Sequence, residues 1–68
     1  MSSTILTTRE KSIFESLIQN KTTKEIAIEL GISEKTVRNH ISNVIQKLGV
    51  SSRASAVVEL LKLKELSL

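Results

Sequence analysis

The sequence predicts an all-α fold of four short helices. Apolar residues recur at helical spacing in four separate stretches. Hydroxyl residues stand where those helices would begin, and both glycines stand where one would end. Proline is absent, so nothing forbids a helix in any stretch. With 68 residues the chain has room for one small domain. We expect it to cover residues 6–68, with residues 1–5 as a disordered tail.

The composition is that of a globular protein and restricts its chemistry. Hydrophobic residues make up 40% of the chain and charged residues 25%, a balance typical of a folded domain. The absence of cysteine excludes disulfides and thiolate metal sites. No apolar run is long enough for a membrane span, and the polar start MSST is unlike a secretory signal. We therefore expect a cytoplasmic protein.

The first two helices are expected at residues 8–19 and 23–30. Each would begin with a capping box, in which a threonine and a glutamate three residues later bond each other's backbone amide. The two boxes are Thr7 with Glu10 and Thr22 with Glu25. Phe14 is the only aromatic residue and stands on an apolar stripe, so we expect it in the core rather than stacked on a base. The inward-facing residues would be Ile13, Phe14, Leu17, Ile18, Ile26, Ala27 and Leu30.

The third helix, predicted at residues 34–48, has two chemically different sides on a helical wheel of about 100° per residue. One side is apolar and holds Val37, Ile41, Val44 and Leu48. The other side consists of hydrogen-bond donors without negative charge, namely Lys35, Arg38, Asn39, Ser42 and Gln46. Such a helix can pack on a core and lie in the major groove of DNA, which is wide enough to admit it.

The positive charge of the chain is concentrated in the same region. The net charge is +3, and residues 33–53 carry all of it, with four basic side chains against Glu34. A polyanion would therefore dock there. Two interpretations of Glu34 are open. It interacts favourably with the positive end of the helix, which we favour, or it accepts a hydrogen bond from cytosine N4.

The offsets of Ala27, Gly31 and Val37 are those of a helix-turn-helix unit. Beyond residue 5 the whole chain resembles the LuxR-type family, also called the GerE type. The matching motifs are Leu6-Thr7-x-Arg9-Glu10, Thr22-x-Lys24-Glu25-Ile26-Ala27, Ile32-Ser33-x-Lys35-Thr36-Val37-Arg38-x-His40, Lys47-Leu48-Gly49-Val50-x-x-Arg53 and Ala56-Val57. This resemblance implies a sequence-specific transcription regulator of double-stranded DNA on the bacterial nucleoid. It implies no enzymatic activity, cofactor, metal, membrane or small-molecule ligand.

Most members of the family carry this domain behind a phosphoreceiver or ligand-binding module. The segments around residues 21–27, 34–43 and 56–61 are most similar to stand-alone members from spore-forming bacteria, which implies control of sporulation (spore coat) genes. The alternative is a DNA-binding domain excised from a larger response regulator or quorum-sensing regulator.

The resemblance also implies roles for individual residues. Base edges would be read by Arg38, Asn39, Ser42 and Lys35. Phosphates would be bound by Lys24, Thr23, Ser33, Thr36, His40, Asn43 and Lys47. Lys35, Thr36 and Asn43 could each hold a phosphate or a base, and Lys47 is the weaker candidate because it lies nearer the core. A partly buried, hydrogen-bonded position for His40 is an equally good interpretation.

The fourth helix is predicted at residues 53–65, with Ala54, Val57, Leu60 and Leu61 on one side. It has more apolar residues than one contact requires, so part of it would be exposed. The resemblance supplies a second copy as partner, giving a homodimer on an inverted repeat with recognition helices ~34 Å apart. The interface would use Ala54, Val58, Leu61 and Lys62. A monomer with a slightly apolar surface is the alternative. RNA polymerase is a further candidate partner.

Other functions compete with this one. A promoter-recognition domain like region four of bacterial sigma factors shares the helix-turn-helix, but Leu48-Gly49-Val50-x-x-Arg53 and a fourth helix argue against it. A helical adaptor that binds only protein leaves the local positive charge unexplained. An enzyme would need a phosphate loop, a metal-ligand cluster or a nucleophile–base set, and the sequence has none.

Arg53 lies away from the donor-rich side of the third helix. We expect it to tie the fourth helix to the rest of the domain.

Overall fold

Each of the four helices begins at a hydroxyl side chain. The computed structural model describes residues 5–68, and its helices are α1 (Thr8–Ile18), α2 (Thr23–Leu30), α3 (Glu34–Leu48) and α4 (Arg53–Lys62). The capping residues are Thr7, Thr22, Ser33 and Ser52. Each of these hydroxyls accepts a hydrogen bond of 3.1 Å from the amide three residues on. The all-α prediction is confirmed, since the described residues contain no strand.

Both predicted capping boxes are present. The amide of Thr7 donates to the Glu10 carboxylate over 3.0 Å, and the amide of Thr22 donates to Glu25 over 2.8 Å. These bonds satisfy backbone N–H groups that the first turn of a helix leaves without intrahelical partners. They fix where α1 and α2 begin.

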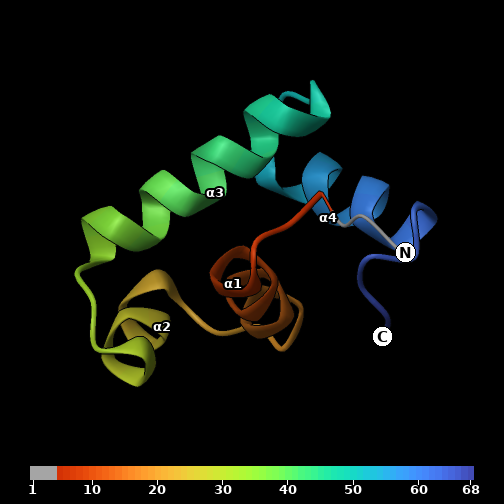
Figure 1. Ribbon diagram of the computed structural model, residues 1–68. Helices are drawn as coiled ribbons and strands as arrows, with labels where there is room; N and C mark the ends of the chain where they lie inside the picture. The colour runs from red at the N-terminus through yellow and green to blue at the C-terminus, as the bar shows by residue number, and fades with distance from the viewer. Residues whose placement is uncertain (1–4) are drawn as a thin grey trace.

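α3 is the centre of the packing. It runs across the molecule in Figure 1 and contacts α1, α2 and α4. The six largest fully buried side chains are Ile13, Phe14, Ile26, Val37, Val44 and Leu60. Phe14 therefore lies in the core, as predicted. On the apolar side expected for α4, Leu60 is buried and Ala54 is exposed, and Ala56 is buried as well.

A residue with positive φ follows the end of α1, α2 and α3 within two positions. Gly31 and Gly49 follow α2 and α3 with φ of +68° and +67°, which glycine adopts without the steric penalty of a side chain. Asn20 has the same conformation two residues after α1, with φ of +67°. The turn between α2 and α3 is therefore built as the helix-turn-helix offsets indicate.

The predicted end of α4 at residue 65 is wrong. The helix ends at Lys62, because Lys64 takes a left-handed conformation with φ of +61°. The amides of Glu65 and Leu66 then turn back to the carbonyl of Leu60, at 2.9 and 3.3 Å. This reversal brings Leu66 into the core, where it is only 5% exposed.

A partly buried ion pair, between the buried Glu10 and the exposed Lys47, joins α1 to the end of α3. Glu10 is 3% exposed, and its Oε1 accepts from the Lys47 ammonium at 2.5 Å. Lys47 also donates to the carbonyl of Ile5 at 3.1 Å. Residues 1–4 of the expected tail lie outside the described residues. The ion pair brings together two sites 37 positions apart in the sequence.

Burial alone would raise the pKa of Glu10, because it disfavours the charged carboxylate. The Lys47 hydrogen bond, the Thr7 amide and the charges of Lys47 and His40 outweigh that effect. The pKa of Glu10 is therefore lowered, and the carboxylate is held ionised.

Candidate nucleic-acid interface

α3 presents opposite chemistry on its two sides. Val37, Ile41 and Val44 are buried against the other helices. The residues predicted to read bases are all exposed, namely Lys35, Arg38, Asn39 and Ser42. Asn43 and Gln46 are exposed beside them. The predicted orientation of α3 is therefore observed, while the contacts of these side chains with DNA stay a prediction.

The N-terminal ends of α2 and α3 supply the expected phosphate-binding groups. Lys24 and Ser33 are exposed, whereas Thr23 and Thr36 are half-buried. The hydroxyls of Ser33 and Thr36 lie 2.9 Å apart and share a hydrogen bond. The Ser33 hydroxyl also accepts from the Thr36 amide. The first-turn amides of both helices carry the partial positive charge that favours a phosphate oxygen.

Glu34 has partners that neither interpretation of its role anticipated. Its Oε1 accepts from the hydroxyl of Thr23 at 3.4 Å and lies 3.5 Å from Nη1 of Arg38. The Arg38 pair has the i, i+4 spacing at which side chains meet on a helix. That spacing is visible in the sequence and could have suggested the pair. The link from Thr23 in α2 depends on the fold.

Two residues expected to bind phosphate, Lys47 and His40, have surroundings in the structure that bear on that role. The ammonium of Lys47 is engaged by Glu10 and the Ile5 carbonyl, so we leave it out of the proposed phosphate contacts. His40 is half-buried, and its imidazole makes no hydrogen bond within residues 5–68. Its proximity to Glu10 lowers the pKa of that carboxyl. Partial burial of His40 is thus observed, but the hydrogen bond expected with it is not.

The outward face of α4 holds most of the predicted dimer interface. Val58 is 51% exposed, and Ala54 and Lys62 are exposed beside it. Leu61 is half-buried and packs against the core. Only part of the Leu61 side chain is therefore available to a second copy.

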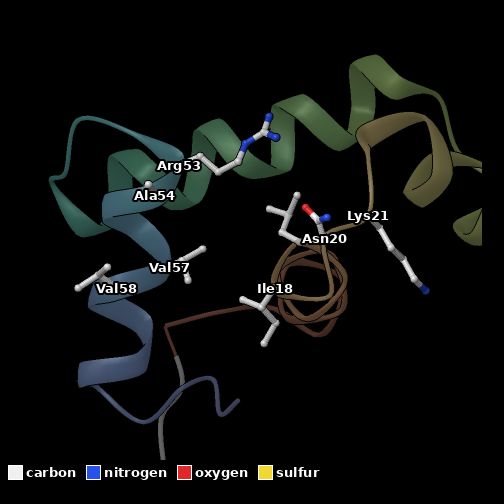
Figure 2. Close-up of a pocket in the computed structure, with 8 residues that line it drawn as sticks. Ile18, Asn20, Lys21, Arg53, Ala54, Val57 and Val58 are labelled. Carbon is white, nitrogen blue, oxygen red and sulfur yellow. The ribbon is translucent and has the colours of Figure 1, made fainter.

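Two shallow grooves flank this face of α4. The first, of 490 Å³, lies between α4 and the end of α1. Figure 2 shows Ala54, Val57 and Val58 on the α4 side and Ile18 and Asn20 on the other. The second, of 360 Å³, is lined by Val50, Ala54, Ser55, Val58, Glu59 and Lys62. Ala54 and Val58 line both grooves.

The expected role of Arg53 is wrong. Arg53 is exposed at the edge of the first groove (Figure 2), and its guanidinium makes no ion pair or hydrogen bond within residues 5–68. α4 is instead held by apolar contacts, with Ala56 and Leu60 fully buried.

Two other kinds of feature, a metal site and a membrane-spanning helix, were sought in the described residues. Over residues 5–68 no group of three or more histidine, cysteine, aspartate or glutamate side chains is placed to hold a metal ion. None of the helices there has the length and apolarity needed to cross a bilayer. The fold and the donor-rich side of α3 define a helix-turn-helix DNA-binding protein.

Known proteins agree with this class. Residues 4–60 match the family described as bacterial regulatory proteins, luxR family. The chain is 69% identical over 64 residues to the spore germination protein GerE of Bacillus subtilis (strain 168), covering 94% of this chain and 86% of that protein. A solved structure described as that of the transcription factor GerE matches with a TM-score of 0.93 and 62% identity, over 96% of this chain and 97% of the other.

A second relative is much longer. The transcriptional regulatory protein DegU of Brevibacillus brevis is 45% identical over 58 residues, which cover 85% of this chain but 25% of DegU. The family match covers well over half of the chain. The chain therefore belongs to the luxR family of bacterial regulatory proteins and is a DNA-binding transcription regulator.

Proposed function

We propose that this regulator controls sporulation genes by binding a specific duplex site with α3 in the major groove. The observation that carries the DNA part is the orientation of α3, which buries its apolar side and exposes Arg38, Asn39 and Ser42. The sporulation part rests on the 69% identity to a protein named for spore germination. Spore coat genes are the targets that we expect. We propose no catalytic role.

In the proposed complex each exposed side chain has a distinct task. Arg38 would donate two hydrogen bonds to guanine O6 and N7, and Asn39 would pair with adenine N6 and N7. Ser42 and Lys35 would contact neighbouring base edges. The contacts that position the domain without reading sequence would come from Lys24, Thr23, Ser33, Thr36, His40 and Asn43.

We further propose that two copies bind together through α4. The exposed Val58 and Ala54, with Lys62 and the outer edge of Leu61, would form the shared face. Two-fold symmetry then requires an inverted repeat, because each copy meets the same half-site. A regulator of this kind works where the chromosome lies, so we place it in the cytoplasm on the nucleoid. RNA polymerase is the further partner that activation would require.

Selection from a random pool tests the proposal directly. The full chain is mixed with duplexes that carry a randomised segment, and bound duplexes are recovered and sequenced. We expect enrichment of an inverted repeat whose half-sites are about one helical turn apart, ~34 Å. Recovery of sequences no different from the input would contradict sequence-specific binding. Enrichment of a single, non-repeated site would contradict the dimer alone.

A further inference from the structure

An acidic side chain stands at the end of α3 that would enter the groove first. Glu34 is the first residue of the helix, and its side chain is 44% exposed. It is the only acid among residues 33–53. A carboxylate there repels phosphates and base-edge acceptors unless its charge is compensated. Interaction with the positive end of α3 does not require either of the two side-chain partners that Glu34 has.

Through these two partners Glu34 links α2 to Arg38, the proposed base-reading residue. One oxygen, Oε1, receives the Thr23 hydroxyl at 3.4 Å and the Arg38 Nη1 at 3.5 Å. Thr23 is half-buried at the start of α2, so the Glu34 carboxylate has one partner that lies outside α3. The Glu34 contact occupies one nitrogen of Arg38. A guanidinium has five N–H donors in all, and two of them suffice for a guanine.

We propose that Glu34 is a positioning residue for DNA recognition, which holds Arg38 in the orientation that reads a base. This inference rests on the proposed function, since it assumes that Arg38 reads DNA. Glu34 restrains the guanidinium near the first turn of α3 and leaves its other N–H groups free. It also cancels part of the attraction that Arg38 would exert on any phosphate. The two effects favour selective over non-selective binding.

Removal of the Glu34 charge should therefore act in opposite directions on the two kinds of binding. Random-sequence duplexes should bind more tightly, because a repulsive charge is lost. Discrimination at the base pair read by Arg38 should fall, because the guanidinium is no longer restrained. Loss of a residue that only stabilises the end of the helix would leave the discrimination unchanged, although the loss of its charge would still raise random-sequence binding. A residue that reads cytosine N4 itself would set the preference at a base pair whether or not Arg38 is present.

The experiment uses the duplex selected by the wild-type chain and a variant of it with the Arg38-dependent base pair exchanged. That pair is the one at which Arg38→Ala lowers the preference most. Glu34→Gln should reduce the affinity ratio of the two duplexes by about two- to fivefold, the range for an exposed ion pair. Binding of a random-sequence duplex should rise. Thr23→Val should lower the same affinity ratio by a smaller factor, because it removes only the hydroxyl that donates to Glu34.

Glu29→Gln is the matched control, since it removes an equal charge from the ion pair of Glu29 with Lys21 on α2. It should leave the affinity ratio unchanged. In an Arg38→Ala background Glu34→Gln should have no further effect on the ratio. An unchanged ratio in Glu34→Gln, or an equal loss with and without Arg38, would overturn the inference. If Arg38→Ala itself leaves every base preference intact, the proposed function fails instead. Circular dichroism confirms that each variant is folded.

Discussion

Arg38 is the residue on which the proposed base recognition depends most. It extends from the exposed side of α3, and its side chain is 57% exposed. Arg38→Ala should weaken the selected site by about 1–3 kcal/mol and relax the preference at one base pair. A titration of the selected duplex and its single-pair variants, followed by fluorescence anisotropy, measures both effects.

Lys24→Ala is the matched control for Arg38. Lys24 is exposed near the start of α2, where we expect it to contact phosphate. Its loss should weaken all duplexes alike and reduce the slope of log affinity against log salt by about one. If Arg38→Ala behaved in this way too, with every base preference kept, Arg38 would be a phosphate ligand and the assigned reading face would be wrong.

Glu10 should make the stability of the domain depend on pH. Its folded pKa is lowered, since the Lys47 and Thr7 hydrogen bonds outweigh the effect of burial. A group with a lowered folded pKa stabilises the fold above its unfolded value of 4.5 and loses that contribution as pH falls through the folded pKa. Glu10→Gln should therefore lower the free energy of unfolding at neutral pH by about 1–2 kcal/mol. The difference from wild type should shrink below about pH 4.5.

Urea unfolding at several pH values checks this expectation. The comparison with Glu10→Gln is needed because the Thr22 amide and hydroxyl also lower the pKa of Glu25. Both proteins carry that second group, so it cancels in the difference. A difference that stayed constant from pH 7 to pH 3 would show that the charge of Glu10 is not what stabilises the fold.

At the scale of single residues, the sequence predicted local contacts and missed distant ones. The bond between the Thr7 amide and Glu10 was predicted from a spacing of three residues. The Lys47 partner of the same carboxylate was not, because no local pattern links two positions 37 apart. The Arg38 partner of Glu34 falls between these cases, since the i, i+4 spacing permits the pair but does not require it.

Among the helices, the bounds of α2 and α3 were predicted to the residue. Both begin after a hydroxyl cap and end at a glycine, so both ends have strong local signals. α1 ended one residue earlier than expected, at Ile18. α4 ended three residues early, because no glycine or proline marks its end and Lys64 itself takes the left-handed conformation. Burial of Leu66 depends on packing that a local pattern does not contain.

Gly31 gives a test at this scale. Its φ is +68°, and an added methyl group would meet no atom within 4 Å beyond those of the adjoining residues. Gly31→Ala should therefore cost only the strain of the left-handed conformation, about 1–2 kcal/mol. Gly31→Asn should cost less, because asparagine tolerates that conformation better. Urea unfolding measures both. A loss well above this range in Gly31→Ala would mean that the turn also has to move.

For the whole molecule, the main prediction concerns the pairing of two copies. The longest extent of the domain is 30 Å, less than one turn of DNA at ~34 Å, so we expect one copy to cover one half-site. Val58→Glu should prevent pairing, because it places a charge at the centre of the proposed face. Since Val58 is 51% exposed, the fold should survive. Sedimentation with the selected duplex should then show one copy bound in place of two.

Val58→Ala is the control for this substitution, because it shortens the side chain without adding charge. Leu61→Glu is a poorer choice, since Leu61 packs against the core and its loss would disturb the fold as well. Two copies of Val58→Glu bound to the inverted repeat would place the pairing surface elsewhere. The sequence predicted an apolar excess on the fourth helix, but only the packing shows which members of it are left outside.

The four hydroxyl caps have a consequence for protein engineering. Aspartate is as good a helix cap as serine, so an engineer seeking a more heat-resistant variant could place it at Thr7 or Ser52. At Thr22 or Ser33 the same exchange would put an anion beside the amides proposed to bind phosphate. The uncharged caps at those two positions leave the amides accessible to a phosphate. A variant made more thermostable there should therefore bind nucleic acid less tightly.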